Sequence, residues 1–122
     1  MDALKFLHQR FGFAAVAFAI VLGVWGGYQF VRYRRLSGGF RSSFLLLIGL
    51  VAVQGVIGGL LLLGGRRPGE WPLHIVYGIF AVVFLPGMYF YSERRDDLRE
   101  AAVLAAACWI VVIALLRGLT TG

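Results

Sequence analysis

Charged residues fall in short clusters along the chain, and long runs without charge separate the clusters. The four longest runs contain 21, 24, 22 and 16 residues, at 11–31, 42–65, 71–92 and 101–116. About 20 consecutive apolar residues form a helix that crosses the hydrocarbon core of a bilayer. The pattern therefore predicts a single transmembrane domain, 1–122, with helices at about 4–33, 42–64, 72–92 and 98–117. Arg117 is expected to extend the short fourth helix by placing its guanidinium at the interface.

The composition narrows the class of protein. Hydrophobic residues make up 60% of the 122 residues, and charged residues only 15%. Soluble domains are typically about half apolar. The composition therefore excludes an ordinary cytosolic domain, a disordered chain and a nucleic-acid-binding module, in spite of a net charge of +6. The single cysteine, Cys108, excludes an internal disulfide, and we expect it to be a small packing residue.

Short connections between the predicted helices indicate an all-α, up-down-up-down four-helix bundle. Basic residues favour the cytoplasmic side of a membrane. With the N-terminus outside, the inner loops hold seven arginines and the outer ends five basic residues. The inner set is Arg32, Arg34, Arg35, Arg41, Arg94, Arg95 and Arg99, and the outer set is Lys5, Arg10, Arg66, Arg67 and Arg117. We therefore expect both termini on the outer face of the cell inner (plasma) membrane.

The only two histidines of the chain stand in matching surroundings. Residues 7–12 read LHQRFG around His8, and residues 73–78 read LHIVYG around His74. The shared pattern, L-H-x-x-aromatic-G, opens the first and the third predicted helix, which indicates two pseudo-equivalent helical hairpins. These two helices are parallel and lie diagonally across an up-down bundle. We therefore expect the two imidazoles to face each other across the core at one end.

Two imidazoles that face each other can serve as the axial ligands of a six-coordinate haem iron. Gly12 and Gly78 each lie four residues after a histidine, on the same helix face. The missing side chains would leave room for a flat macrocycle. We therefore predict one haem b per chain, with His8 and His74 as axial ligands. Zinc is the weaker alternative, because no carboxylate or thiol completes a tetrahedral ligand set.

Other residues at this end are expected to surround the cofactor. Arg10, Arg66 and Arg67 are predicted to pair with the haem propionates, and ordinary anchoring at the interface is the alternative for each of them. Phe11 and Tyr77 are expected to flank the macrocycle, although Tyr77 is also typical of an interfacial aromatic belt.

Gln54 is the only strongly polar residue in the middle of the predicted helix 42–64. Its amide is expected to hydrogen-bond a neighbouring helix or the edge of the cofactor. The stretch VQGVIGG at 53–59, a Gly-Arg-Arg-Pro turn and the motif at His74 are together similar to the haem A synthase family. The motif at His8 resembles the first histidine motif of that family.

The resemblance covers roughly residues 3–90, which is about one half of a full-length family member. Full-length members consist of two fused four-helix halves, each with a histidine pair, so the resemblance implies one haem-holding bundle. Two features of the family are missing. Lys5 stands where the family has the glutamate tied to its oxygenation chemistry, and the cysteine pair that many bacterial members carry in an outer loop is absent.

These observations favour a b-type cytochrome-like subunit, with its haem near the outer face, that transfers electrons within a larger redox or photosynthetic membrane complex. A bis-histidine iron has no open position, which favours electron transfer over enzymatic oxygen chemistry. Two alternatives stay open. One is a half-size haem A synthase-like enzyme that acts as a homodimer, and Lys5 argues against it. The other is a cofactor-free structural subunit that packs through glycine-rich faces. The expected partners are other integral membrane subunits or a second copy, and the lipid bilayer.

Overall fold

Four long α-helices make up most of the part of the protein that the structure describes. The computed structural model describes residues 2–65, 71–92 and 98–121. The helices are α1 (Asp2–Arg32), α2 (Gly38–Leu63), α3 (Trp71–Ser92) and α4 (Leu98–Thr121). All four are long and apolar enough to cross a membrane. The predicted all-α membrane bundle is confirmed, and the protein is a multi-pass helical membrane protein.

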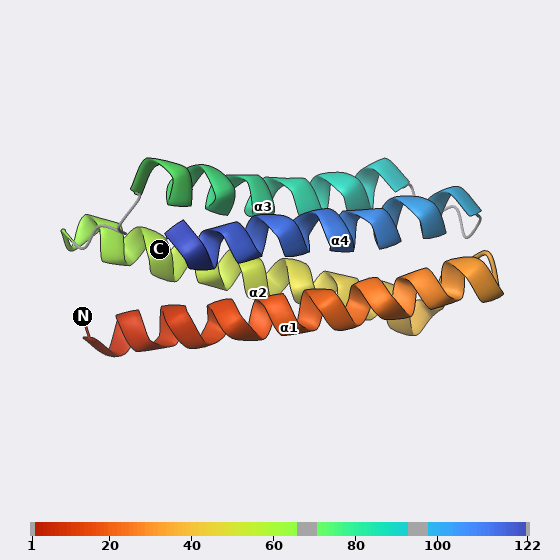
Figure 1. Ribbon diagram of the computed structural model, residues 1–122, viewed down its shortest axis with the longest axis horizontal. Helices are drawn as coiled ribbons and strands as arrows, with labels where there is room; N and C mark the ends of the chain where they lie inside the picture. The colour runs from red at the N-terminus through yellow and green to blue at the C-terminus, as the bar shows by residue number, and fades with distance from the viewer. Residues whose placement is uncertain (1, 66–70, 93–97, 122) are drawn as a thin grey trace.

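The helices run antiparallel to their neighbours, so that both ends of the chain lie at the same end of the bundle (Figure 1). α1 packs against α2 and α4, and α3 packs against the same two helices. Within the described ranges, the backbones of α1 and α3 do not approach each other, nor do those of α2 and α4. The four helices therefore form a ring in which α1 and α3 are diagonal, as the sequence predicts.

Two helix ends differ from the sequence prediction. α2 begins at Gly38 rather than near residue 42, because Ser37 caps it and its hydroxyl accepts a hydrogen bond from the backbone N–H of Phe40 at 3.1 Å. α4 continues to Thr121, four residues beyond the predicted end. Between α1 and α2 the chain reverses at Arg34, whose φ of 59° is left-handed. This conformation costs a non-glycine residue about 1–2 kcal/mol.

The core contains large apolar side chains of α2 packed between small residues of the other helices. Phe40, Phe44 and Leu47 are fully buried. Ala19 of α1 and Cys108 of α4 belong to the same cluster. Cys108 thus occupies the packing position that the sequence analysis expects for it.

Glycines let the helices of this core approach closely. A Cβ at Gly23 would lie 2.8 Å from the indole of Trp109, and this indole donates a hydrogen bond to the Gly23 carbonyl at 3.1 Å. A Cβ at Gly26 would lie 2.8 Å from the ring of Phe40. Small residues at helix interfaces serve this purpose in membranes. These two positions therefore fix the packing of α1 against α4 and α2.

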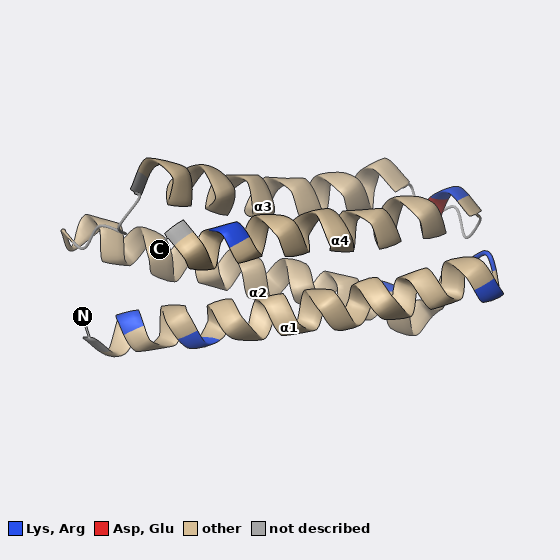
Figure 2. Cartoon of the chain, viewed as in Figure 1, with Lys and Arg blue, Asp and Glu red and all other residues tan. Residues whose placement is uncertain are grey.

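Many large apolar side chains lie on the outside of the bundle. Phe13, Val83 and Phe90 are 61%, 63% and 76% exposed. Exposed apolar area of this extent is not tolerated by a soluble monomer but suits contact with lipid. The described charged residues lie towards the two ends of the bundle, and the middle of the helices carries none (Figure 2). The distribution is that of a protein whose middle lies in the hydrocarbon layer.

Candidate functional site

The two histidines meet across the diagonal of the bundle. His8 lies near the start of α1 and His74 near the start of α3, so both are at the end that holds the chain termini. The centroids of the two imidazole rings are 5.9 Å apart, and the ring planes are inclined by 66°. Both side chains are partly buried. The structure thus brings together the two residues that the repeat singled out.

A carbonyl at the end of α4 orients His74. The Nδ1 atom of His74 is 2.9 Å from the carbonyl oxygen of Gly118. The last four carbonyls of a helix lack partners within that helix, so this carbonyl is available as an acceptor. When Nδ1 carries the proton and donates it to Gly118, the lone pair is on Nε2. Metal-binding histidines typically donate their second ring nitrogen to a backbone carbonyl in this way.

A glycine of α2 makes room for the ring of His8. A Cβ at Gly58 would lie only 3.0 Å from Cε1 of His8, closer than ordinary carbon contacts. The Nδ1 atom of His8 is buried and has no hydrogen-bond partner among the residues that the structure describes. A buried polar atom without a partner costs free energy. The position of His8 is therefore fixed by close packing, while one of its polar atoms stays unsatisfied.

Gln54 ties α2 to the backbone of α1 beside His8. Its Nε2 donates a hydrogen bond to the carbonyl oxygen of His8 at 2.7 Å. Its Oε1 is buried and, in the described part of the chain, has no hydrogen-bond partner. The expected bond to a neighbouring helix is therefore present. Gln54 and Gly58 lie one turn apart on α2, so one face of this helix contacts both the backbone and the ring of His8.

The two glycines that follow the histidines have different surroundings. A Cβ at Gly12 would lie 3.1 Å from Nε2 of Gln54, so the space beside Gly12 holds this amide. A Cβ at Gly78 would meet nothing within 4 Å in the described part of the chain. The space at Gly78 is open, whereas the space at Gly12 is filled by the residue that holds His8. The two halves of the repeat are therefore not equivalent in their side-chain contacts.

The basic and aromatic residues expected around a cofactor are placed as follows. Arg10 is exposed, and its guanidinium lies 5.1 Å from the centroid of the Phe6 ring. Tyr77 is half-buried, with the guanidinium of Arg117 5.7 Å from its ring centroid. Phe11 is half-buried on α1. The remaining two arginines of the expected set, Arg66 and Arg67, lie outside the described residues.

Among the residues that the structure describes, the histidine pair has no third protein ligand of the kind that zinc needs. Within residues 2–65, 71–92 and 98–121, no group of three or more His, Cys, Asp or Glu side chains is assembled. The histidine pair therefore offers two nitrogen ligands to a metal. Two nitrogens suit the axial positions of a metal whose other four ligands belong to a cofactor.

The opposite end of the bundle holds a buried ion pair, which the sequence analysis did not identify. The Nε and Nη2 atoms of Arg41 donate hydrogen bonds to the carboxylate of Glu100 at 2.6–3.1 Å. The side chain of Glu100 is fully buried. Arg41 is on α2 and Glu100 on α4, so this pair bridges the second diagonal of the bundle. One signal in the sequence could have indicated this pair: both residues lie in the first turn of an even-numbered helix, and these two turns are at the same end of the bundle.

Two cavities lie elsewhere on the described structure. One, of about 410 Å³, opens at the turn between α1 and α2, next to Arg35 and Arg41. The other, of about 310 Å³, is an apolar groove between α3 and α4, beside Tyr77 and Phe80. The sequence pattern indicated neither of them.

Comparison with known proteins adds no further assignment, because no family model, curated protein or solved structure matches this chain.

Proposed function

We propose that the protein is a b-type cytochrome-like membrane subunit that binds one haem b through His8 and His74 and transfers electrons within a larger membrane complex. The observation that carries the proposal is the meeting of two imidazoles from diagonal helices, with ring centroids 5.9 Å apart. Two imidazoles this close can bind one metal ion between them, with each nitrogen about 2 Å from the metal.

The donor set fits a haem in three respects. His74 is oriented by a backbone carbonyl, as metal-binding histidines usually are. His8 and Gln54 each present a buried polar atom that has no partner in the described part of the chain. Gly78, one turn after His74 on α3, is exposed and leaves open space at the surface beside it. A haem would supply reversible one-electron chemistry at this end of the bundle.

The residues of the chain have distinct tasks under this proposal. His8 and His74 would hold the haem iron, while Gln54 holds the backbone of His8 and the carbonyl of Gly118 orients the imidazole of His74. Two protein ligands leave no open position, which favours electron transfer over reactions with oxygen. The resemblance to one half of haem A synthase supports the haem-holding bundle, and Lys5 at the glutamate position argues against synthase activity.

The proposed setting is the plasma membrane, with both termini and the histidine pair at the outer face. The cluster of Arg32, Arg34, Arg35, Arg41 and Arg99 would then lie on the cytoplasmic side, which the general preference of basic loops supports. Arg94 and Arg95, which belong to the same count, lie outside the described residues.

A partner within the membrane is also part of the proposal. Gly27, Gly49, Gly59 and Gly87 lie on the helices with nothing within 4 Å of an added Cβ in the described part of the chain. Such positions allow a helix of another subunit, or of a second copy, to approach closely. The same glycines support the alternative of a cofactor-free structural subunit, and haem analysis distinguishes the two.

The test is the reduced-minus-oxidised absorption spectrum of the purified protein and of two variants. The intact protein should show the sharp α-band of a six-coordinate low-spin haem b and should not bind carbon monoxide. His8→Ala and His74→Ala should each give a five-coordinate high-spin haem that binds carbon monoxide, or lose the haem. The control is Gln9→Ala, an exposed polar neighbour of His8, which should keep the original spectrum.

Three results would contradict this proposal. A protein without haem would favour the structural subunit, and extraction of haem O or haem A would favour the synthase-like enzyme. An unchanged low-spin spectrum in either histidine variant would show that the replaced histidine is not an axial ligand.

A further inference from the structure

The cavity of about 410 Å³ between α1 and α2 lies at the level of the membrane surface. The membrane-spanning part of α1 ends at Arg32, and that of α2 begins at Gly38. Four residues of the turn between them line the cavity together with Gln29, Gly38 and Arg41; the four are Tyr33, Arg35, Leu36 and Ser37. Its size is within the usual range of small-molecule sites, about 300–1,000 Å³. The cavity therefore opens where lipid headgroups lie.

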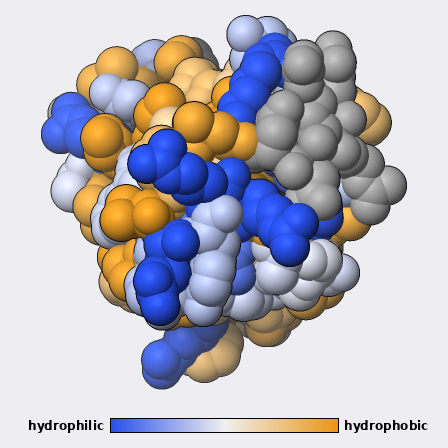
Figure 3. Space-filling model, turned by 90° about the vertical axis from the view of Figure 1, so that its right-hand side faces the viewer, coloured by the Kyte–Doolittle hydropathy of each residue, from blue (hydrophilic) through white to orange (hydrophobic). Residues whose placement is uncertain are grey.

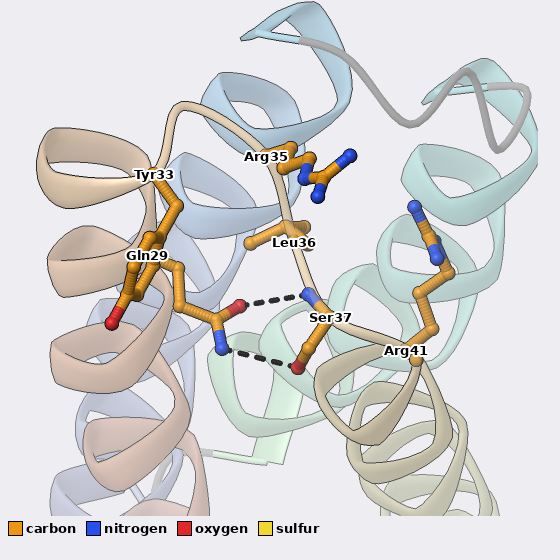
Figure 4. A pocket seen from close by; sticks show the side chains of 7 residues that line it. Gln29, Tyr33, Arg35, Leu36, Ser37 and Arg41 are labelled. Carbon is orange, nitrogen blue, oxygen red and sulfur yellow. Dashed lines mark hydrogen bonds between the residues drawn. The ribbon is translucent and has the colours of Figure 1, made fainter.

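Hydrogen bonds within the protein hold the wall of this cavity. The amide of Gln29 accepts a bond from the backbone N–H of Ser37 at 3.0 Å and donates one to the Ser37 hydroxyl at 3.1 Å. Figure 4 shows these two bonds, with the side chains of Arg35 and Arg41 on the other side of the turn. Gln29 is only 6% exposed, so the turn is anchored to the buried face of α1. The cavity is thus part of an ordered turn.

Two arginines line the cavity, and the described residues supply a carboxylate to only one of them. The guanidinium of Arg41 is paired with the carboxylate of Glu100. Arg35 also lines the cavity, and the described residues offer it no ion pair or hydrogen bond. Gly38, the first residue of α2, also lines the cavity, at the positive end of the helix dipole. Hydrophilic side chains gather over the centre of this end of the bundle, with hydrophobic side chains between and beside them (Figure 3).

We propose that this cavity binds a phosphate group, and that an anionic phospholipid headgroup supplies it. The guanidinium of Arg35 presents several N–H donors in a plane that matches phosphate oxygens. Basic pockets between membrane helices recognise anionic headgroups in this way. The site is at the end of the bundle opposite to the histidine pair and does not depend on the proposed haem.

The experiment measures phospholipid binding by the whole chain in neutral detergent. Phosphatidylglycerol and phosphatidylcholine with the same acyl chains are titrated, and bound lipid is counted by native mass spectrometry. Phosphatidylglycerol should bind in preference to phosphatidylcholine. Arg35→Gln should weaken phosphatidylglycerol binding by about tenfold, the loss typical of one charge-assisted hydrogen bond. The control is Arg32→Gln, which removes the same charge from an exposed position outside the cavity lining and should change binding by about twofold at most.

A second arm identifies the source of the phosphate. Thermal stability is measured in inorganic phosphate and in chloride of equal ionic strength. Stabilisation by inorganic phosphate that depends on Arg35, without preferential phosphatidylglycerol binding, would overturn the lipid assignment and retain a site for free phosphate. Equal losses in the two arginine variants, or no preference for an anionic species in either arm, would overturn the site itself. Because Arg35 is exposed, the variant should fold, and circular dichroism checks its helix content.

Discussion

Replacement of Gly58 by alanine tests the histidine site directly, because this position contacts the ring of His8. The new Cβ would lie 3.0 Å from Cε1 of His8. Carbon atoms attract one another best at about 3.5–4.0 Å, so one partner has to move by about half an ångström. The backbone of His8 is tied to α2 by Gln54, which leaves the imidazole as the part that moves. We expect the His8 ring to shift relative to His74.

The expected cost follows from two opposing effects. Inserting a methyl group into a close contact costs about 1–3 kcal/mol. Alanine in place of glycine stabilises a helix by about 0.8–1.0 kcal/mol. Gly59 supplies the matched control, because it is the next residue of α2 and its Cβ would meet nothing within 4 Å in the described part of the chain. Gly58→Ala should therefore be less stable than Gly59→Ala by the steric cost alone, about 1–3 kcal/mol.

The free energy of unfolding of both variants can be measured by titration with sodium dodecyl sulfate, followed by circular dichroism. If the protein carries haem, the absorption spectrum should change in Gly58→Ala and stay unchanged in Gly59→Ala. Equal unfolding free energies for the two variants would refute the close contact between Gly58 and His8. In that case α2 would not position the imidazole of His8.

Two other predictions concern the ion pair and the topology. Arg41→Gln removes the guanidinium that binds the buried carboxylate of Glu100 and should destabilise the protein in the same unfolding titration, by up to about 3–5 kcal/mol. Adding Glu100→Gln should recover most of this loss, and a double variant no more stable than Arg41→Gln would argue against the pair. In a cysteine-free variant, single cysteines at Ser37 and Thr120 should react with a membrane-impermeant maleimide from opposite sides. Reaction from the same side would contradict four membrane spans.

The fold could be predicted because a long apolar run in a bilayer is stable only in a few structures, of which the membrane-spanning helix is the usual one. The spacing of charges located four spans, and the short connections determined which helices are neighbours. The same reasoning placed His8 and His74 at one end of diagonal helices, where the structure has them. Each of these inferences depends on how far a residue lies from the end of its helix and on the order of the helices along the chain. Both can be read directly from a sequence.

Rotation of a helix about its axis could not be predicted. α2 is apolar on all sides over most of its length, so the sequence marks no face of this helix as buried. Gln54 is marked by its polarity, yet its acceptor is a backbone carbonyl, which any residue could supply. For the same reason nothing identified the Gly118 carbonyl as the partner of His74. The role of Gly58 also depends on the rotation of α2 against α1 and was therefore missed.

The contacts of the two histidines also bear on how the protein is assembled during synthesis. His8 is packed and tied by Gln54 and Gly58 of α2, so the first hairpin completes these surroundings before the second is made. His74 is oriented by Gly118 of α4, so its ring gains this partner only after α4 has been made. A ribosome-bound chain that ends after α3 would contain both histidines, but His74 would lack the Gly118 carbonyl that orients its ring. Any ligand that needs both rings in position should therefore be acquired only after α4 has joined the bundle.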